Sequence, residues 1–85
     1  MFETKEKLYS LSKACKAHSS KTAIYVLYSV ERHIMTGRAT RQFEENFLQF
    51  PDERFTELID YCLERDLSND GIIKSVKYFI KKSDM

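Results

Sequence analysis

Residues 19–37, SSKTAIYVLYSVERHIMTG, decide the fold because their apolar residues recur every three or four positions. This spacing places one apolar set on a single side of a helix. The set consists of Ala23, Leu27, Val30 and Ile34. The β-branched and aromatic run 24–28 also suits a strand. The helical spacing continues past that run and ends near Gly37, a residue type common just after a helix C-terminus, so we expect a helix that ends at about residue 36.

The same segment predicts where this helix lies in the molecule. Further apolar residues flank the aligned set, namely Ile24, Val26, Tyr28 and Met35. An apolar arc this wide is typical of a helix that is covered on most sides, so we expect the central and most buried helix here. Ser19 and Ser20 precede it as candidate N-cap residues.

An amphipathic helix is expected before this junction, over residues 3–17, with His18 at its end. Its narrow apolar side consists of Thr4, Leu8, Leu11, Cys15 and His18. Its outer side carries Lys5, Tyr9, Lys13 and Lys16. The first helix is therefore expected to present a basic face that also holds an aromatic ring.

Two further helices are expected in the middle of the chain. A short one over residues 39–50 places Ala39, Phe43, Phe47 and Phe50 on one face. Pro51 ends it, and because proline suits the first helical position, we expect the fourth helix to begin there, with Asp52 and Glu53 in its first turn. The apolar stripe of the fourth helix is Phe55, Leu58, Ile59 and Cys62.

The last helix is expected to follow three cap candidates, Ser68, Asn69 and Asp70, and to run to about Lys82. Its buried side is expected to be Ile72, Ile73, Val76, Phe79 and Ile80. Its outer side is expected to be Lys74, Lys77, Tyr78 and Lys81. Together these segments predict an all-α fold, a compact bundle of about five short helices in a single domain over residues 1–85.

The composition agrees with this fold and limits the classes of protein. Two Gly and one Pro in 85 residues argue against a turn-rich β-sandwich. The longest apolar run, residues 23–28, is too short to span a membrane, and no signal-peptide pattern precedes it. Cys15 and Cys62 are therefore expected to be reduced thiols in the cytoplasm.

The net charge of +1 conceals a strong segregation of charge along the chain. Residues 1–42 carry a net +5, residues 43–70 a net −7 and residues 71–85 a net +3. Basic side chains neutralise phosphates and a tyrosine can stack on a base, so the basic N-terminal half predicts contact with nucleic acid, with RNA as the preferred class. The predicted contact residues are Lys5, Tyr9, Lys13, Lys16, Lys21, Arg38 and Arg41.

The acidic fourth helix predicts a surface for a protein partner. Its acidic residues at helical spacing are Glu53, Glu57, Asp60 and Glu64. Such a stripe can pair with the basic helices of its own chain, with a second copy or with a basic partner, and this complementarity sets specificity more than affinity. A homo-oligomer is therefore one of the arrangements compatible with this stripe.

The residue patterns of a catalytic or metal site are weak. Cys15 and His18 lie three residues apart on a helix and could touch one metal ion or form a nucleophile–base pair. A closed zinc site needs four ligands, and only His33 and Cys62 remain as further candidates. A glycine-rich phosphate loop is also missing. We expect no metal, no cofactor, no small-molecule substrate and no enzymatic activity.

One alternative interpretation is a helix-turn-helix regulator that binds DNA. Residues 53–82, ERFTELIDYCLERDLSNDGIIKSVKYFIKK, fit a pattern of helix, tight turn and helix, with Lys74, Lys77 and Lys81 on the outer side. A DNA-reading helix usually offers Arg, Asn or Gln to base edges, whereas this helix offers lysines and Tyr78. A pure protein–protein adaptor without nucleic-acid contact is the other alternative.

The two ends of the chain, MFETKEKLYSLSKA and KYFIKKSDM, and its richness in Lys, Glu and Tyr resemble the small early proteins of T-even-type bacteriophages. Several of these bind and reprogram a host enzyme or block a defence system. Within this group the chain is similar to phage inhibitors of the ToxN ribonuclease toxin, small antitoxin-like proteins that also bind RNA. The resemblance implies a toxin-binding surface and RNA contact through Lys13, Lys16, Lys21, Arg38 and Arg41. We therefore expect a non-enzymatic, antitoxin-like inhibitor that binds a partner protein and contacts RNA.

Overall fold

The computed structural model describes residues 2–65 and 68–82, and this part of the chain is helical without any strand. Its elements in chain order are α1 (Phe2–His18), α2 (Lys21–Met35), α3 (Arg41–Gln49), the short 3-10 helix η1 (Asp52–Arg54), α4 (Phe55–Leu63) and α5 (Asn69–Lys82). The predicted all-α bundle of five short helices is confirmed. None of the described helices is long and apolar enough to cross a bilayer.

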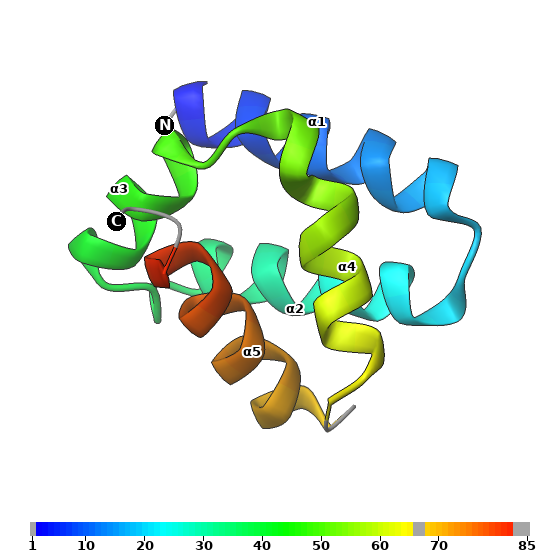
Figure 1. Ribbon diagram of the computed structural model, residues 1–85. Helices are drawn as coiled ribbons and strands as arrows, with labels where there is room; N and C mark the ends of the chain where they lie inside the picture. Colours follow the sequence, from blue (N-terminus) through cyan, green and yellow to red (C-terminus); the bar gives the residue numbers. More distant parts are fainter. Residues whose placement is uncertain (1, 66–67, 83–85) are drawn as a thin grey trace.

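The helices pack into one body of 28 × 28 × 22 Å. In Figure 1, α1 and α2 run in opposite directions above one another, and α4 crosses in front of both. Helix α2 packs against α1, α4 and α5, so its predicted central place is confirmed. The largest fully buried side chains come from all five α-helices and from the corner between α3 and η1: Leu11, Val26, Val30, Phe47, Phe50, Phe55, Leu58, Ile59, Ile72, Val76 and Ile80.

Helix α2 buries only half of its wide apolar arc. Ala23, Val26 and Val30 are fully buried. In contrast, Ile24, Tyr28 and Met35 are 47%, 60% and 64% exposed, so the expectation that the whole apolar arc is covered is wrong. The reason is geometric: the neighbours of α2 cover one side of it, and residues at positions i, i+4 and i+11 form a second stripe that faces away. On α5, Ile73 and Phe79 are likewise only half-buried.

The junction of α1 and α2 needs two residues. Ser19 adopts a left-handed conformation with φ of 61°, which reverses the chain directly after α1. Ser20 then caps α2, and its Oγ accepts a hydrogen bond from the Ala23 N–H at 3.1 Å. The short linker keeps the ends of α1 and α2 close, and the two helices lie antiparallel and in contact (Figure 1).

The C-terminus of α2 is closed by a Schellman motif. Gly37 has a left-handed φ of 74°. Its N–H donates to the Ile34 carbonyl, and the Arg38 N–H donates to the His33 carbonyl, both at 3.1 Å. These are the two backbone hydrogen bonds that define the motif, so the predicted helix stop at Gly37 is confirmed.

The segment around Pro51 differs from the prediction. Helix α3 begins at Arg41 because Thr40 caps it by accepting the Phe43 N–H at 3.1 Å, which leaves Ala39 outside the helix. Pro51 does not begin α4: its ψ of 130° is extended, and the 3-10 helix η1 follows before α4 begins at Phe55. Asp52 and Glu53 therefore lie in η1 and not in the first turn of α4.

Lys7 stabilises this corner between α3 and α4. From α1, its Nζ donates to the Phe50 carbonyl and to Asp52 Oδ1, the latter at 2.6 Å, and it lies 5.4 Å from the centre of the Phe55 ring. The hydrogen bond from Lys7 lowers the pKa of Asp52. Lys7 is only 13% exposed, so this lysine supports the fold by holding the α3–α4 corner against α1.

Replacing Gly37 with alanine is expected to destabilise the protein by about 1 kcal/mol. No heavy atom lies within 4 Å of the position that a Cβ would take, so the loss comes from the left-handed backbone alone. Urea unfolding measures the change. Gly37→Asn is the control and should lose less, because asparagine tolerates this conformation better. A Gly37→Ala protein as stable as the parent would contradict the assignment.

Candidate nucleic-acid and partner interfaces

A groove of about 500 Å³ lies between α2 and α5 and is lined by cationic side chains from two distant parts of the chain. These are Arg32, Arg38, Lys74 and Lys77, and we call this site the basic groove. Asp70, near the start of α5, also contributes to its lining. The packing of α2 on α5 thus brings the positively charged first half of the sequence together with its positively charged end.

His33 lines the basic groove and responds to the charges around it. Its ring meets Phe43 edge-on at 5.2 Å, and among the described residues its buried Nε2 has no hydrogen-bond partner. Burial lowers the pKa of His33, and the positive charges of Lys77 and Arg38 lower it further. Cations from α5 and from the α2–α3 connection therefore act on the same point, and the ring is neutral at pH 7.

A second groove, of about 790 Å³, lies between α1 and α2, and we call it the apolar groove. Its lining is Lys5, Leu8, Tyr9 and Ser12 from α1, Tyr28, Glu31, Arg32 and Met35 from α2, and the C-cap residue Thr36. Tyr28, Arg32 and Thr36 line the basic groove as well, so the two grooves meet across α2. A ligand bound in one would therefore lie next to a ligand bound in the other.

The seven predicted nucleic-acid contacts are all exposed, but they do not form one cluster around either groove. Lys5 and Tyr9 line the apolar groove, and Lys13 Nζ lies 5.0 Å from the centre of the Tyr9 ring. Arg38 lines the basic groove. The other three lie outside both linings: Lys16, Lys21 and Arg41.

Three residues of the basic groove, Arg32, Lys74 and Lys77, were not among the predicted contacts. The sequence signals their charge and their outward position. It carries no local signal that α2 and α5 lie side by side, and this contact alone makes them one site.

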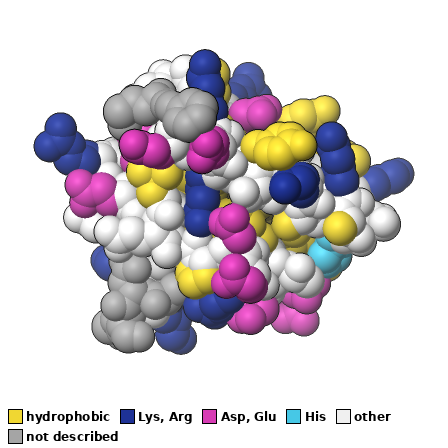
Figure 2. All heavy atoms as spheres, turned by 90° about the horizontal axis from the view of Figure 1, so that it is seen from above, with side chains coloured by type: hydrophobic (Ala, Val, Ile, Leu, Met, Phe, Trp, Pro, Cys, Tyr) yellow, Lys and Arg dark blue, Asp and Glu magenta, His cyan; other side chains and the backbone are white. Residues whose placement is uncertain are grey.

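Charged side chains are distributed unevenly over the surface. Figure 2, which looks down on the side of α1, shows Lys and Arg side chains around exposed hydrophobic side chains toward one end of this face. Acidic side chains gather mainly along the middle and lower part of the same view. Lys and Arg side chains also lie at the left and lower edges of this view, so outside that end of the face the two kinds of charge are interspersed.

The predicted acidic surface is exposed, and much of its charge is paired within the chain. Glu57 accepts hydrogen bonds from Arg54 at 3.0 and 3.2 Å. Glu64 lies 3.7 Å from its neighbour Arg65. Asp60 pairs with a histidine of α1, and Glu53 is an exposed residue of η1. Three of the four acidic residues therefore already have a partner in their own chain, and the pair of Asp60 joins two helices.

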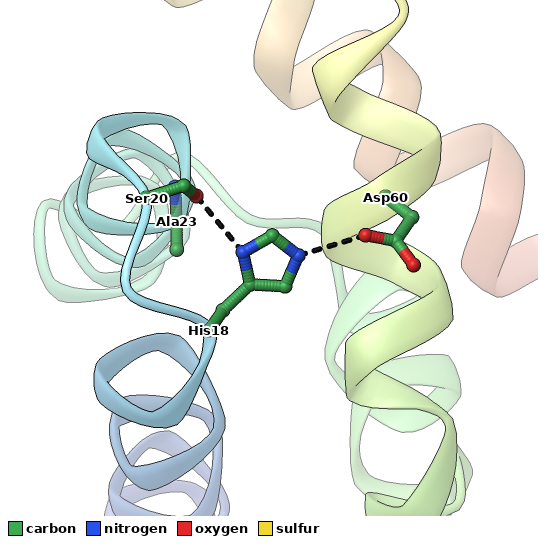
Figure 3. Close-up of polar contacts among 4 residues, drawn as sticks. All are labelled: His18, Ser20, Ala23 and Asp60. Atoms are coloured by element: carbon green, nitrogen blue, oxygen red, sulfur yellow. Dashed lines mark hydrogen bonds and ion pairs between the residues drawn. The ribbon is translucent and has the colours of Figure 1, made fainter.

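His18 connects three helices through a serine and an aspartate (Figure 3). Its Nε2 lies 2.7 Å from Asp60 Oδ1 on α4, and its Nδ1 lies 3.0 Å from Ser20 Oγ at the start of α2. Ser, His and Asp are the residue types of a hydrolase triad. Here the serine oxygen also accepts the Ala23 N–H as a helix cap, so the arrangement joins the ends of α1 and α2 to α4.

Cys15 and Cys62 are buried, with 2% and 1% exposure. Burial raises the pKa of each thiol to about 11. A thiol with this pKa is protonated near neutral pH and is a poor nucleophile and metal ligand. Within residues 2–65 and 68–82, no three His, Cys, Asp or Glu side chains are placed to share a metal ion.

No protein-family model, curated protein or solved structure matches the chain. The phage-type and inhibitor-type functions expected from the two ends of the sequence therefore stay predictions. The geometry and charge of the two grooves provide the basis for a functional proposal.

Replacing Ser20 with alanine is expected to lower the free energy of unfolding by about 1 kcal/mol. The Ala23 N–H and the ring of His18 both lose a partner in this variant. Asp60→Asn should lose less, because the Asp60 side chain is 62% exposed and water screens its pair with His18. Urea unfolding of both variants tests the order, and a larger loss for Asp60→Asn would contradict it.

The stability of the protein is expected to fall as the pH rises from about 9 to about 11. The unfolded thiols lose their protons near their ordinary pKa of 9.0, whereas the buried thiols keep theirs up to about 11, so in this range the unfolded state binds fewer protons. Urea unfolding at a series of pH values measures the decline. A Cys15→Ala/Cys62→Ala variant lacks both groups and should show a shallower decline, and an equally steep one would contradict this origin.

Proposed function

We propose that the protein is a small non-enzymatic binding protein that contacts RNA through the basic groove and acts on a partner protein. The observation that carries the proposal is the set of four cations from two distant parts of the chain around one groove: Arg32, Arg38, Lys74 and Lys77. Lysine-rich helix faces often serve only solubility. Four cations that line a concave site from two sides are an arrangement suited to binding an anionic chain.

The chemistry of the lining favours the phosphates of a single strand. A guanidinium group can fork onto two phosphate oxygens, and a lysine adds a point charge. Tyr28, on the wall shared by the two grooves, is 60% exposed and offers its ring to a base. A basic groove beside an exposed aromatic ring is the usual combination for binding single-stranded nucleic acid with little sequence preference.

The same geometry argues against a sequence-specific DNA reader. A recognition helix must enter the major groove alone and offer hydrogen-bonding side chains to base edges. The side of α5 that carries Lys74 and Lys77 instead faces a groove whose other wall is α2. A nucleic acid placed there meets cations from two helices, which favours contact with the backbone over readout of bases.

The partner-protein part of the proposal rests on exposed apolar surface. Such a surface becomes buried when it covers part of a larger molecule. The resemblance of the chain ends to phage inhibitors suggests a ribonuclease toxin as that molecule, in the cytoplasm of a host cell. The pure adaptor is the second candidate, favoured by Tyr9, Tyr28 and Met35, which are each at least 60% exposed around one groove.

A Lys74→Glu/Lys77→Glu variant is expected to bind a fluorescein-labelled oligouridine at least about tenfold more weakly than the parent protein. Fluorescence anisotropy measures binding over a range of salt concentrations. Four phosphate contacts predict a slope of about −3 in a plot of log K against log salt, and loss of two of them should make it shallower.

The matched control is Lys81→Glu/Lys82→Glu, which makes the same change of charge on the same helix but outside the lining of the groove. It should retain most of the affinity. Equal losses in both variants would show that only net charge matters and would refute a site at the basic groove. A Lys13→Glu/Lys16→Glu/Lys21→Glu variant reports separately on the predicted contacts of α1.

A further inference from the structure

The exposed stripe of α2 forms one wall of the apolar groove and has no covering element in the described structure. Tyr28 and Met35 of this stripe line the groove, and Tyr9 of α1 stands opposite them. They are 60%, 64% and 65% exposed, whereas Leu8 beside them is buried. Two tyrosines, a methionine and Arg32 in one groove have the composition of a protein-binding hot spot, where Tyr, Met and Arg are enriched.

The shape of the apolar groove suits a helix. Its walls are two antiparallel helices, with residues 5–12 of α1 opposite residues 28–35 of α2. Each wall is about two helical turns long, and the volume between them is about 790 Å³. An amphipathic helix laid along such a groove buries its apolar stripe against both walls, a common mode of peptide recognition.

The charges around the apolar groove indicate what flanks that stripe. Lys5 and Arg32 belong to the lining, and Lys13 Nζ lies over the ring of Tyr9. Glu31 is the acidic residue of the lining. The excess of positive charge around an apolar floor calls for a ligand with acidic residues on both sides of its apolar stripe.

A second copy of the chain fits this groove poorly. A two-fold dimer through the groove would bring together two linings of the same net positive charge. The acidic helix α4 of another copy is the remaining candidate, but Glu57 and Asp60 already have partners in their own chain.

We infer that the apolar groove between α1 and α2 is the docking site for an acidic amphipathic helix of a protein partner. The inference rests on the proposal that the protein acts on a partner. It places the main protein-binding surface in the apolar groove, which has an excess of positive charge, and not on the acidic helix α4. The docked helix would lie beside RNA in the basic groove, with Tyr28 and Arg32 between the two ligands.

The test uses a fluorescein-labelled helical peptide of about four turns, with leucines at helical spacing flanked by glutamates, and a second peptide in which lysines replace the glutamates. The acidic peptide should bind the full-length protein at least about tenfold more tightly than the basic one. Methyl NMR of labelled methionine locates the site, because the Met35 methyl, identified with Met35→Leu, should shift on binding.

Tyr28→Glu should weaken binding of the acidic peptide about tenfold or more. Tyr25→Glu is the matched control, since Tyr25 is a 51% exposed tyrosine of the same helix that does not line the groove. It should leave the affinity nearly unchanged. Equal loss in both variants, equal affinity for the two peptides, or an unshifted Met35 methyl would overturn the inference.

Two further outcomes would overturn it in favour of another occupant. A dimer in light scattering that Tyr28→Glu abolishes would assign the groove to a second copy. Oligouridine that displaces the peptide and shifts the Met35 methyl would assign it to RNA. The Lys74→Glu/Lys77→Glu variant separates the two proposals: it should lose its affinity for oligouridine and retain its affinity for the peptide. If the acidic peptide does not bind while oligouridine still does, the docking site alone is refuted.

Discussion

The structure depends on a single constraint: α2 carries two apolar stripes, and its neighbours can cover only one of them. Ala23, Val26 and Val30 pack inward against α1, α4 and α5, and this contact fixes how the helix is turned about its axis. With that stripe inside, the second stripe must face solvent along α1, and Arg32 must lie where α1 and α5 flank α2. Both grooves are consequences of how one helix is oriented.

Much of the fold follows from local patterns in the sequence. The helices, the caps at Ser20 and Ser68 and the stop at Gly37 are encoded by spacing and by residues with particular backbone preferences, which operate over a few positions. The errors lie where a distant contact decides. Lys7 holds the corner after Phe50 from 43 residues away, and no pattern near Pro51 announces it.

The candidate sites show the same division. The exposure of the seven predicted contact residues could be deduced from the sequence pattern, and all seven side chains are exposed. Their grouping could not, because it depends on which helices become neighbours. Arg38 and Lys77, 39 positions apart in the sequence, act together on His33 only after α5 has packed on α2. A broad apolar arc likewise does not reveal which of its edges will remain uncovered.

The two grooves differ in how much of the chain each requires. The walls of the apolar groove come from residues 5–36, consecutive helices joined by Ser19 and Ser20. The basic groove needs α5, which follows α1 and α2 in the chain. During translation all residues of the apolar groove therefore leave the ribosome before Lys74 and Lys77 of the basic groove. Local opening of α5 would remove two of the four cations of the basic groove and none of the residues that line the apolar groove, so the pattern of local opening would affect the two proposed binding surfaces differently.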